Sequence, residues 1–265
     1  MSITIIRNAA VAVALGVAAT SCGGANVSLE KIDETTEPTT KSFDVNGPNG
    51  AADVNKEVRP STFTATAIGS QVTAYAEPSV ESETIQSFAS PNVYGDITGQ
   101  AVTFQSINHD TRPEGWVNVL LPIRPNGSTG WVQQSEVSLV ENSFRIEVDR
   151  ASHELRVLER GKVIQTTPVA IGTGDTPTPV GSFYINELLQ PIDQNGPYGS
   201  FAYGLSGFSE TLEEFNGGNG VVGIHGTNDP ATIGTDVSHG CIRLENDVIE
   251  TMVESVPLGT PVYIT

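Results

Sequence analysis

From residue 63 to the C-terminus, short runs of alternating apolar and polar residues are separated by Gly, Pro, Asn and Asp. Alternation is typical of β-strands, because successive side chains of a strand point to opposite faces. Residues 144–149, Phe-Arg-Ile-Glu-Val-Asp, are one such run. Residues 173–182 cannot form a helix, because Pro177 and Pro179 interrupt them. We therefore predict a mainly β chain.

One clear helix is predicted close to the C-terminus. Apolar residues recur there at helical spacing, and Pro257 and Gly259 would end the helix. Asn246 or Asp247 would cap its first turn, and residues 261–264 would form a closing strand. The apolar face consists of Val248, Ile249, Met252, Val253 and Val256.

The N-terminus has the features of an export signal. Arg7 precedes a run of Ala, Val, Leu and Gly over residues 9–19, which is too short to span a bilayer as a mature helix. Cleavage before Cys22 would match a bacterial lipoprotein signal, whose cysteine is lipidated, although Ala19 stands where Leu is preferred. Ordinary secretory cleavage nearby is the alternative. We predict a lipoprotein-type signal peptide over residues 1–22 and an exported, extracytoplasmic protein anchored by lipid to the outer face of the cytoplasmic membrane.

A flexible linker is predicted over residues 23–62. This segment is rich in Thr, Glu, Asn, Pro and Gly, and its apolar residues are isolated. A segment of this composition cannot bury enough apolar surface to form a core. It would let an anchored domain reach outward from the membrane.

The charge of the chain excludes one class of partner. The formal net charge is −18, from 31 acidic and 13 basic residues, and the acidic residues are spread along the chain. No basic patch is available to neutralise phosphates, so we expect no nucleic acid as a partner. We expect the protein to be a monomer.

Residues 63–140 predict a small β domain. Two Gly-Trp-Val triplets, at residues 115–117 and 130–132, lie on either side of a polar turn, as on neighbouring strands of a small barrel. The segment resembles the bacterial SH3-like domains that accompany cell-wall enzymes. That resemblance implies wall binding or positioning of the catalytic domain. The alternative is that Trp116 and Trp131 both belong to the core.

The chemistry of the chain is concentrated around Cys241, the only cysteine outside the first 22 residues. Two imidazoles are candidates for taking the thiol proton. His239 would share a face with Cys241 on an extended strand, and His225 could face it from an adjacent strand. Gly240 would let a reacting carbonyl approach the backbone, and the amides of residues 239–241 are candidate oxyanion donors. Arg243 is the only Lys or Arg after Lys162, which suggests an anionic substrate.

His225 followed by Ser238-His-Gly-Cys241 resembles the signature of the L,D-transpeptidases with a YkuD-type catalytic domain. Residues 176–183, Thr-Pro-Thr-Pro-Val-Gly-Ser-Phe, resemble the upstream element of the same family, and the likeness covers residues 143–265. It implies a β-rich catalytic domain in which Cys241 is the nucleophile and His225 the general base, with His239 completing the pocket.

The chain departs from this family at two positions. Gly226 stands where the family often has Ser, so a backbone carbonyl would have to orient the imidazole. Arg243 stands where many relatives have Asn, and it would bind a carboxylate of the stem peptide; a surface ion pair with Glu245 or Asp247 is the alternative. The resemblance implies no metal and no cofactor. The residues expected to contact substrate are Arg243, Ser238, Gly226, Thr227 and Tyr203.

The implied reaction is acyl transfer between peptidoglycan stem peptides. The Cys241 thiolate would attack the third stem residue, typically meso-diaminopimelate, expel the terminal D-alanine and pass the acyl group to a diaminopimelate amine, giving a 3–3 cross-link. The segment 186–220, predicted to be a long loop, would line or cover the donor site with Tyr198, Phe201, Tyr203 and Phe208.

Three alternatives remain open at this point. Water as the acceptor would make the protein an L,D-carboxypeptidase or endopeptidase. A zinc site would use His225, His239, Cys241 and Asp236, although the paired spacing of common zinc sites is absent. A non-catalytic wall-binding lipoprotein would depend on the SH3-like domain alone.

Overall fold

A computed structural model describes residues 13–19, 25–31, 62–91, 93–94, 97–107, 109–215 and 218–265 of the chain. Cys22, with the predicted cleavage and lipidation site, lies outside the described residues, as does most of the predicted linker. Within the described residues, the chain is mainly β with one α-helix, as predicted from the sequence. None of the described helices is long and apolar enough to cross a membrane.

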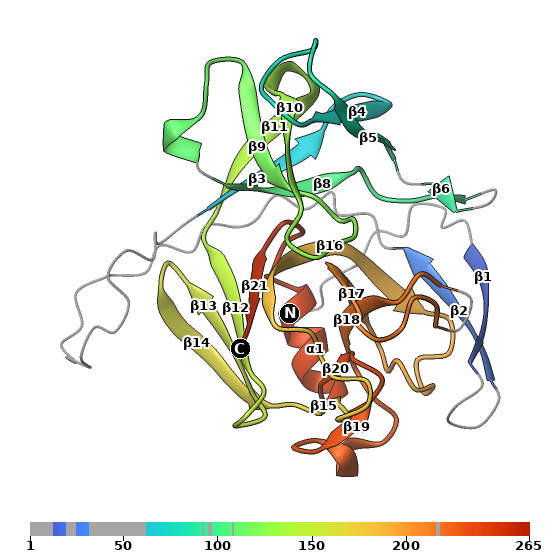
Figure 1. Cartoon of the computed structure of the whole chain (residues 1–265). Helices are drawn as coiled ribbons and strands as arrows, with labels where there is room; N and C mark the ends of the chain where they lie inside the picture. Colours follow the sequence, from blue (N-terminus) through green and yellow to red (C-terminus); the bar gives the residue numbers. More distant parts are fainter. Residues whose placement is uncertain are drawn as a thin grey trace, which may run out of the picture.

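Residues 62–142, called here the first β unit, form a seven-stranded antiparallel sheet in the order β11-β3-β8-β9-β10-β4-β5 (Figure 1). The two Gly-Trp-Val triplets lie on β9 and β10, which are paired neighbours as predicted. Trp116 and Trp131 are half-buried, whereas the valines that alternate with them are buried. The tryptophans therefore lie on the outer face of the sheet, and their assignment to the core is wrong. The strands are β3 (Thr62–Ala67), β4 (Gln71–Tyr75), β5 (Thr84–Ala89), β8 (Thr103–Ile107), β9 (Trp116–Leu120), β10 (Thr129–Gln133) and β11 (Val137–Asn142), with a separate pair β6 (Val93–Tyr94) and β7 (Ile97–Thr98).

Residues 143–265, called here the second β unit, contribute eight strands to a second sheet, in the order β14-β13-β12-β21-β16-β17-β18-β20. The N-terminal strand β2 (Ala25–Lys31) pairs with β16 and with β1 (Val13–Ala19). A short parallel pair, β15 and β19, lies beside this sheet. The strands are β12 (Phe144–Asp149), β13 (Glu154–Glu159), β14 (Lys162–Pro168), β15 (Ile171–Gly172), β16 (Gly181–Pro191), β17 (Ala202–Phe208), β18 (Val221–His225), β19 (Asp236–Ser238), β20 (Ile242–Arg243) and β21 (Pro261–Ile264).

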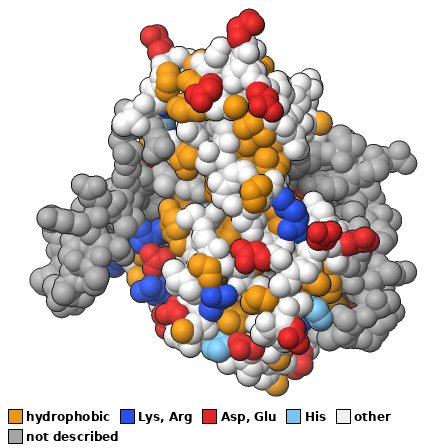
Figure 2. Space-filling model, viewed as in Figure 1, with side chains coloured by type: hydrophobic (Ala, Val, Ile, Leu, Met, Phe, Trp, Pro, Cys, Tyr) orange, Lys and Arg blue, Asp and Glu red, His pale blue; other side chains and the backbone are white. Residues whose placement is uncertain are grey.

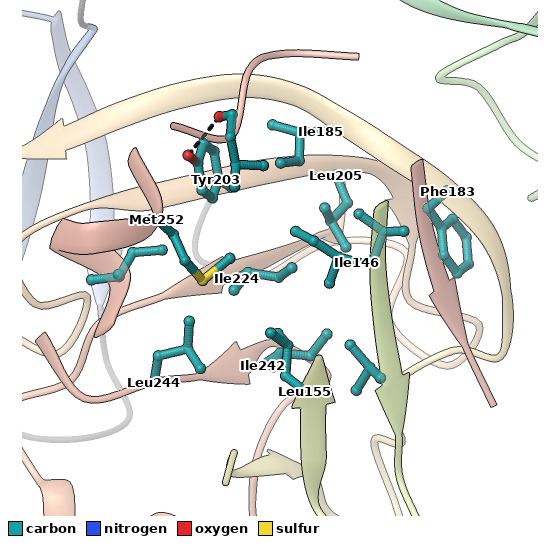
Figure 3. Close-up of a cluster of buried hydrophobic side chains, with 14 of the residues drawn as sticks. Ile146, Leu155, Phe183, Ile185, Tyr203, Leu205, Ile224, Ile242, Leu244 and Met252 are labelled. Atoms are coloured by element: carbon teal, nitrogen blue, oxygen red, sulfur yellow. Dashed lines mark hydrogen bonds between the residues drawn. The ribbon is translucent and has the colours of Figure 1, made fainter. Parts of the chain in front are cut away.

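The core of the second β unit follows from the alternation in the sequence. On β12, Ile146 and Val148 are buried, while the charged residues between them are only partly covered. The side chains of neighbouring strands meet them on the same face (Figure 3). Full burial of each large aliphatic side chain contributes about 1.5–3 kcal/mol, so this face fixes the register of the strands.

Helix α1 (Asn246–Val253) is present where the helical spacing predicts it. Ile249 and Met252 are buried against the second sheet. The predicted cap is wrong, because Glu245 occupies the N-cap position and makes no side-chain capping bond. Asn246 uses its side chain elsewhere, as described below.

The predicted loop over residues 186–220 is wrong for much of its length, because β16 and β17 occupy residues 181–191 and 202–208. Every residue of β17 is buried. A strand covered on both faces has no polar alternation, so its period could not be recognised in the sequence.

The two units pack through β16, which lies between the sheets (Figure 1). Tyr184 of β16 is fully buried in the core of the first β unit. Nearby, the backbone N–H of Leu188 donates to Gln100 Oε1 at 2.9 Å. Acidic side chains are scattered over both units on the face shown in Figure 2 rather than gathered in one cluster. The SH3-like identity of the first unit and the predicted domain boundaries stay predictions.

Candidate active site

The register of β18 and β20 brings the main candidate residues onto one face of the sheet. The strands are parallel, with Ile224 opposite Ile242 and His225 opposite Arg243. Both isoleucines are completely buried in the core, so the residues that flank them point to the other face. Cys241, which directly precedes β20, therefore lies on the face of His225 and Arg243. By the same register, its neighbour on β18 is Gly223, where a Cβ would lie 2.8 Å from the Tyr203 carbonyl oxygen.

His225 is held as a neutral imidazole with a defined tautomer. Its Nδ1 donates a hydrogen bond to the carbonyl oxygen of Gly226 at 2.6 Å, because a carbonyl can only accept. The lone pair is therefore on Nε2. Burial lowers the pKa of His225 to about 4; the bond to Gly226 acts against this shift, and the charge of Arg243 adds to it. The Tyr198 ring lies 4.9 Å from the imidazole, centroid to centroid.

Cys241 is a half-buried free thiol. Burial raises its pKa, while a backbone hydrogen bond from Gly223 and the positive charge of Arg243 lower it by less. At neutral pH the resting pair is therefore a thiol and a neutral imidazole, and the imidazole is in the form that can accept the thiol proton.

The segment from Ser238 to Cys241 is a bend that its own serine holds. The buried hydroxyl of Ser238 accepts from the Gly240 N–H at 3.1 Å and donates to the Cys241 carbonyl at 2.5 Å. Gly240 has φ = 117°, a conformation that favours glycine. The extended strand predicted for His239 to Cys241 is therefore wrong. His239 does not share the face of Cys241 by alternation.

The second motif, residues 176–183, supports this bend through side-chain hydrogen bonds. The Thr178 hydroxyl is buried, donates to the Gly240 carbonyl and accepts from the Gly172 N–H, both at 2.9 Å. Thr176 Oγ1 donates to the Ser238 carbonyl at 3.3 Å. The two motifs therefore form one hydrogen-bonded unit around the nucleophile.

The predicted oxyanion donors are only partly available. The Gly240 N–H is already bonded to Ser238. The backbone N–H groups of His239 and Cys241 have no acceptor among the residues that the structure describes. These two amides remain candidates for binding a developing oxyanion.

His239 is exposed, and its ring stacks on Phe215 with centroids 4.9 Å apart and an angle of 29° between the planes. Phe215 was not predicted as a site residue. It ends a polar segment, Ser-Glu-Thr-Leu-Glu-Glu-Phe. A single aromatic residue beside acidic residues is the only feature of this segment that could have indicated a site residue.

Arg243 is a cation without a counter-ion in the part of the chain that the structure describes. No carboxylate among the described residues lies within ion-pair distance of it, so the predicted alternative pairing with Glu245 or Asp247 is wrong. Its Nε is buried and has no hydrogen-bond partner in the described ranges. Its backbone is fixed by reciprocal hydrogen bonds with Ala170, at 2.8 and 3.0 Å.

Three residues expected to contact substrate have other roles. Tyr203 is 1% exposed, packs in the core and donates its hydroxyl hydrogen to the Val256 carbonyl at 2.9 Å (Figure 3). Thr227 is 3% exposed, and its hydroxyl accepts from the Asp229 N–H. Ser238 is 1% exposed and holds the bend. Their burial leaves them no surface to offer a ligand, so these three predictions are wrong.

Gly226, the fourth such residue, is buried and orients His225 through its carbonyl. A Cβ at Gly226 would lie 2.1 Å from Asn246 Oδ1, and a Cβ at Gly199 would meet the same oxygen. That oxygen accepts from the Thr227 N–H at 3.0 Å and from the Ser200 N–H at 3.4 Å. Asn246 thus joins the start of α1 to the segment after His225. The sequence did not predict this role, because Asn246 was interpreted as a candidate helix cap.

The proposed zinc ligands do not converge. Asp236 contacts His153 instead, with Oδ1 and Nε2 2.6 Å apart. In the part of the chain that the structure describes, no three or more His, Cys, Asp or Glu side chains are grouped so as to hold a metal ion.

Comparison with known proteins gives a consistent set of relatives. The family model of the YkuD L,D-transpeptidase catalytic domain matches residues 143–264. The protein named L,D-transpeptidase YkuD in Bacillus licheniformis is 34% identical over 170 residues, which are 62% of this chain and 93% of that protein. Its namesake in Bacillus subtilis is 40% identical over 122 residues, covering 46% of this chain and 65% of the relative. The solved catalytic domain of the Enterococcus faecium L,D-transpeptidase is 26% identical, over 46% of this chain and 96% of that one, with a TM-score of 0.33.

Proposed function

Since the chain belongs to the family of L,D-transpeptidases with a YkuD catalytic domain, we propose that it forms 3–3 cross-links in peptidoglycan by acyl transfer through Cys241. The observation that carries this proposal is the common face of Cys241 and His225, together with the bond that fixes the tautomer of His225.

The first half of the reaction acylates the enzyme. His225 Nε2 takes the thiol proton of Cys241, and the sulfur attacks the carbonyl carbon of the third stem residue. The oxygen of that carbonyl becomes negative, and the N–H groups of residues 239 and 241, which have no acceptor among the described residues, would donate to it. The C–N bond to the terminal D-alanine then breaks, His225 returns the proton to the leaving amine, and a thioester remains.

The second half transfers the acyl group. The side-chain amine of the third residue of another stem attacks the thioester carbon, and His225 accepts a proton from that amine. The C–S bond breaks, and the proton returns to the sulfur of Cys241. Because the pKa of His225 is about 4, the imidazole is neutral at the start of both halves.

Arg243 supplies charge to this site. Its effect on the pKa of Cys241 means that the cation favours the thiolate over the thiol. Its unpartnered Nε and the absence of an ion pair within the described residues leave the guanidinium able to bind a carboxylate. We assign it to a carboxylate of the stem peptide that donates the acyl group.

The direct test incubates the purified protein with a tetrapeptide-stem muropeptide and measures the masses of the products. Release of D-alanine with formation of a cross-linked dimer is the expected result, and Cys241→Ala should abolish both. Trimmed tripeptide monomers without dimers would instead identify water as the acceptor. A third outcome would identify a non-catalytic wall-binding protein. In that case the wild type forms neither product, and both the wild type and Cys241→Ala bind to sacculi.

A second measurement identifies the nucleophile independently of the acceptor. The intact mass of the protein should increase by one carbapenem adduct, and peptide mapping should find the adduct on Cys241. The matched variant His225→Gln should keep the thiol but slow its acylation.

The remaining features of the chain are proposed in the same framework. Action on the cell wall requires export, which the N-terminal signal and a lipid on Cys22 would provide. The first β unit is proposed to be SH3-like, and the protein is proposed to act as a monomer. Mass spectrometry of the mature N-terminus and a membrane fractionation of a Cys22→Ala variant test the anchor.

A further inference from the structure

A turn of the first β unit binds a segment next to the active site. The turn follows β9 and contains Arg124 and Asn126. The guanidinium of Arg124 donates to three backbone carbonyls of the second unit, those of Ser209 at 2.8 Å, Leu212 at 3.0 Å and Asn219 at 3.1 Å. These acceptors lie 85 to 95 positions away in the sequence, so the contact joins separate parts of the chain.

Asn126 adds a second attachment at the end of β17. Its amide donates to the Phe208 carbonyl at 2.8 Å and accepts from the Phe208 N–H at 2.9 Å. It thus bonds both backbone groups of Phe208, as a neighbouring strand would. The Phe208 ring lies 4.9 Å from the guanidinium carbon of Arg124, within the range of a cation–π contact.

The segment held in this way contacts the bend that precedes the nucleophile. The Ser209 N–H donates to the Gly220 carbonyl at 2.8 Å, which closes the base of the segment. Further along, Phe215 stacks on His239, two residues before Cys241. Gly220 has φ = 75°, and a Cβ there would lie 2.4 Å from the Leu212 carbonyl and 3.0 Å from Arg124 Nη2, so only glycine permits this closure.

We propose that Arg124 and Asn126 are positioning residues for the acyl-donor site, because they hold the segment that places Phe215 against His239. The first β unit is then part of the catalytic apparatus and not only an attached module. This inference rests on the proposed function for its kinetic consequence, but its structural basis can be measured without any substrate.

The structural test uses the ring current of Phe215. Stacking shifts the NMR signals of the His239 ring protons, and Phe215→Leu removes that shift. Arg124→Ala and Asn126→Ala should each reduce the shift, and amides of residues 209–215 should exchange about tenfold faster with solvent. Arg112→Ala is the matched control, because Arg112 bonds to His109 and Gln134 within its own unit. An unchanged His239 signal in both the Arg124 and the Asn126 variant overturns the proposal.

The kinetic test measures turnover of the tetrapeptide donor. Arg124→Ala should lower kcat/KM about tenfold, mainly through a higher KM. Alkylation of Cys241 by iodoacetamide should change less than about twofold, because the thiol and His225 are untouched. Arg124→Lys keeps the charge but cannot reach three carbonyls with one ammonium group, so we expect a partial loss.

A double-variant cycle separates this coupling from general loosening. If Arg124 acts through Phe215, the protein with both Arg124→Ala and Phe215→Leu should be no slower than the slower single variant. The proposal is contradicted if the loss of kcat/KM in the double variant equals the product of the two single losses. It is also contradicted if Arg124→Ala leaves kcat/KM unchanged while the amides exchange faster. An inactive wild type with normal His239 shifts would instead count against the proposed function and leave the positioning contact established.

Discussion

The imidazole of His225 is bonded to the backbone carbonyl of the very next residue, Gly226, with 2.6 Å between Nδ1 and oxygen. The orienting group is therefore part of the main chain, and no side chain at position 226 is needed for it. What the position requires instead is the absence of a side chain, since Asn246 Oδ1 fills the space that a Cβ would take. The close contact of Asn246 Oδ1 therefore accounts for glycine at position 226.

Turnover should persist to unusually low pH. Catalysis needs neutral His225, whose pKa burial lowers to about 4. The acid limb of kcat/KM should therefore have an apparent pKa near 4 and not near the ordinary value of about 6.5. The pH profile of kcat/KM checks this, with His239→Gln as the control that keeps the limb in place. A limb near 6.5 would contradict the assignment of His225 as the buried base.

The same shift should make stability depend on pH. Between pH 6.5 and pH 4 the unfolded chain protonates this histidine while the folded protein does not, so the free energy of unfolding falls as pH falls through this window. The two pKa values predict a loss of about 3 kcal/mol from this group. Urea unfolding at several pH values measures it, and in His225→Gln the slope in this window should be smaller.

Gly226→Ser should damage the site, although the family resemblance led us to expect Ser at this position. The new Cβ would displace Asn246 Oδ1 from the N–H groups of Thr227 and Ser200. Two backbone donors would lose their acceptor, at a cost of about 1–3 kcal/mol. Thermal unfolding and kcat/KM should both decline. In the Asn246→Ala background the added serine should cost less than in the wild type, and equal costs in both would show that the two positions are not coupled.

Arg243→Ala should weaken donor binding and make the thiol less acidic. The loss of a charge-assisted contact to a carboxylate raises KM by about 10- to 100-fold. Because Arg243 lowers the pKa of Cys241, the pH midpoint of iodoacetamide alkylation should move upward in the variant. Arg243→Lys should keep the alkylation midpoint and restore only part of the KM. A variant with unchanged KM would remove Arg243 from the donor site.

Tyr203→Phe should reduce stability without affecting catalysis. The hydroxyl bond to the Val256 carbonyl is buried, and its loss costs about 1–2 kcal/mol. Since Tyr203 lies in the core, the KM for the donor should not change. Denaturant unfolding and steady-state kinetics together test this structural role, and a raised KM for the donor would contradict it.

The sequence predicted those parts of the fold that depend on local periodicity. Three features could be recognised in the sequence: the alternation of β12, the pairing of β9 with β10 and the apolar face of α1. It failed at β17, where burial on both faces removes the alternation. Similarly, Tyr203 was assigned to the substrate because an aromatic residue in an apparent loop carries no sign of a core position.

The site was predictable where the chemistry of the residue types decides. Cys241 as the only cysteine outside the first 22 residues, and Arg243 as the only Lys or Arg after Lys162, can be read from the sequence alone. The choice of His225 over His239 as the base came from the family resemblance. The roles of Ser238 and Asn246 did not, because both depend on contacts between segments that are distant in the sequence or folded into a bend. The link from Arg124 to Ser209 has no sequence signal at all.

Thr178→Val should show that the second motif is a support for the nucleophile. Valine has nearly the shape of threonine, so the change removes the hydroxyl with little loss of packing. The Gly240 carbonyl and the Gly172 N–H would then be buried without a partner, which costs about 1–3 kcal/mol each. Because the Gly240 carbonyl belongs to the bend before Cys241, kcat should fall more than KM rises. Thr178→Ser keeps the hydroxyl and should restore kcat, whereas an equally impaired serine variant would mean that the methyl group, and not the hydrogen bonds, supports the bend.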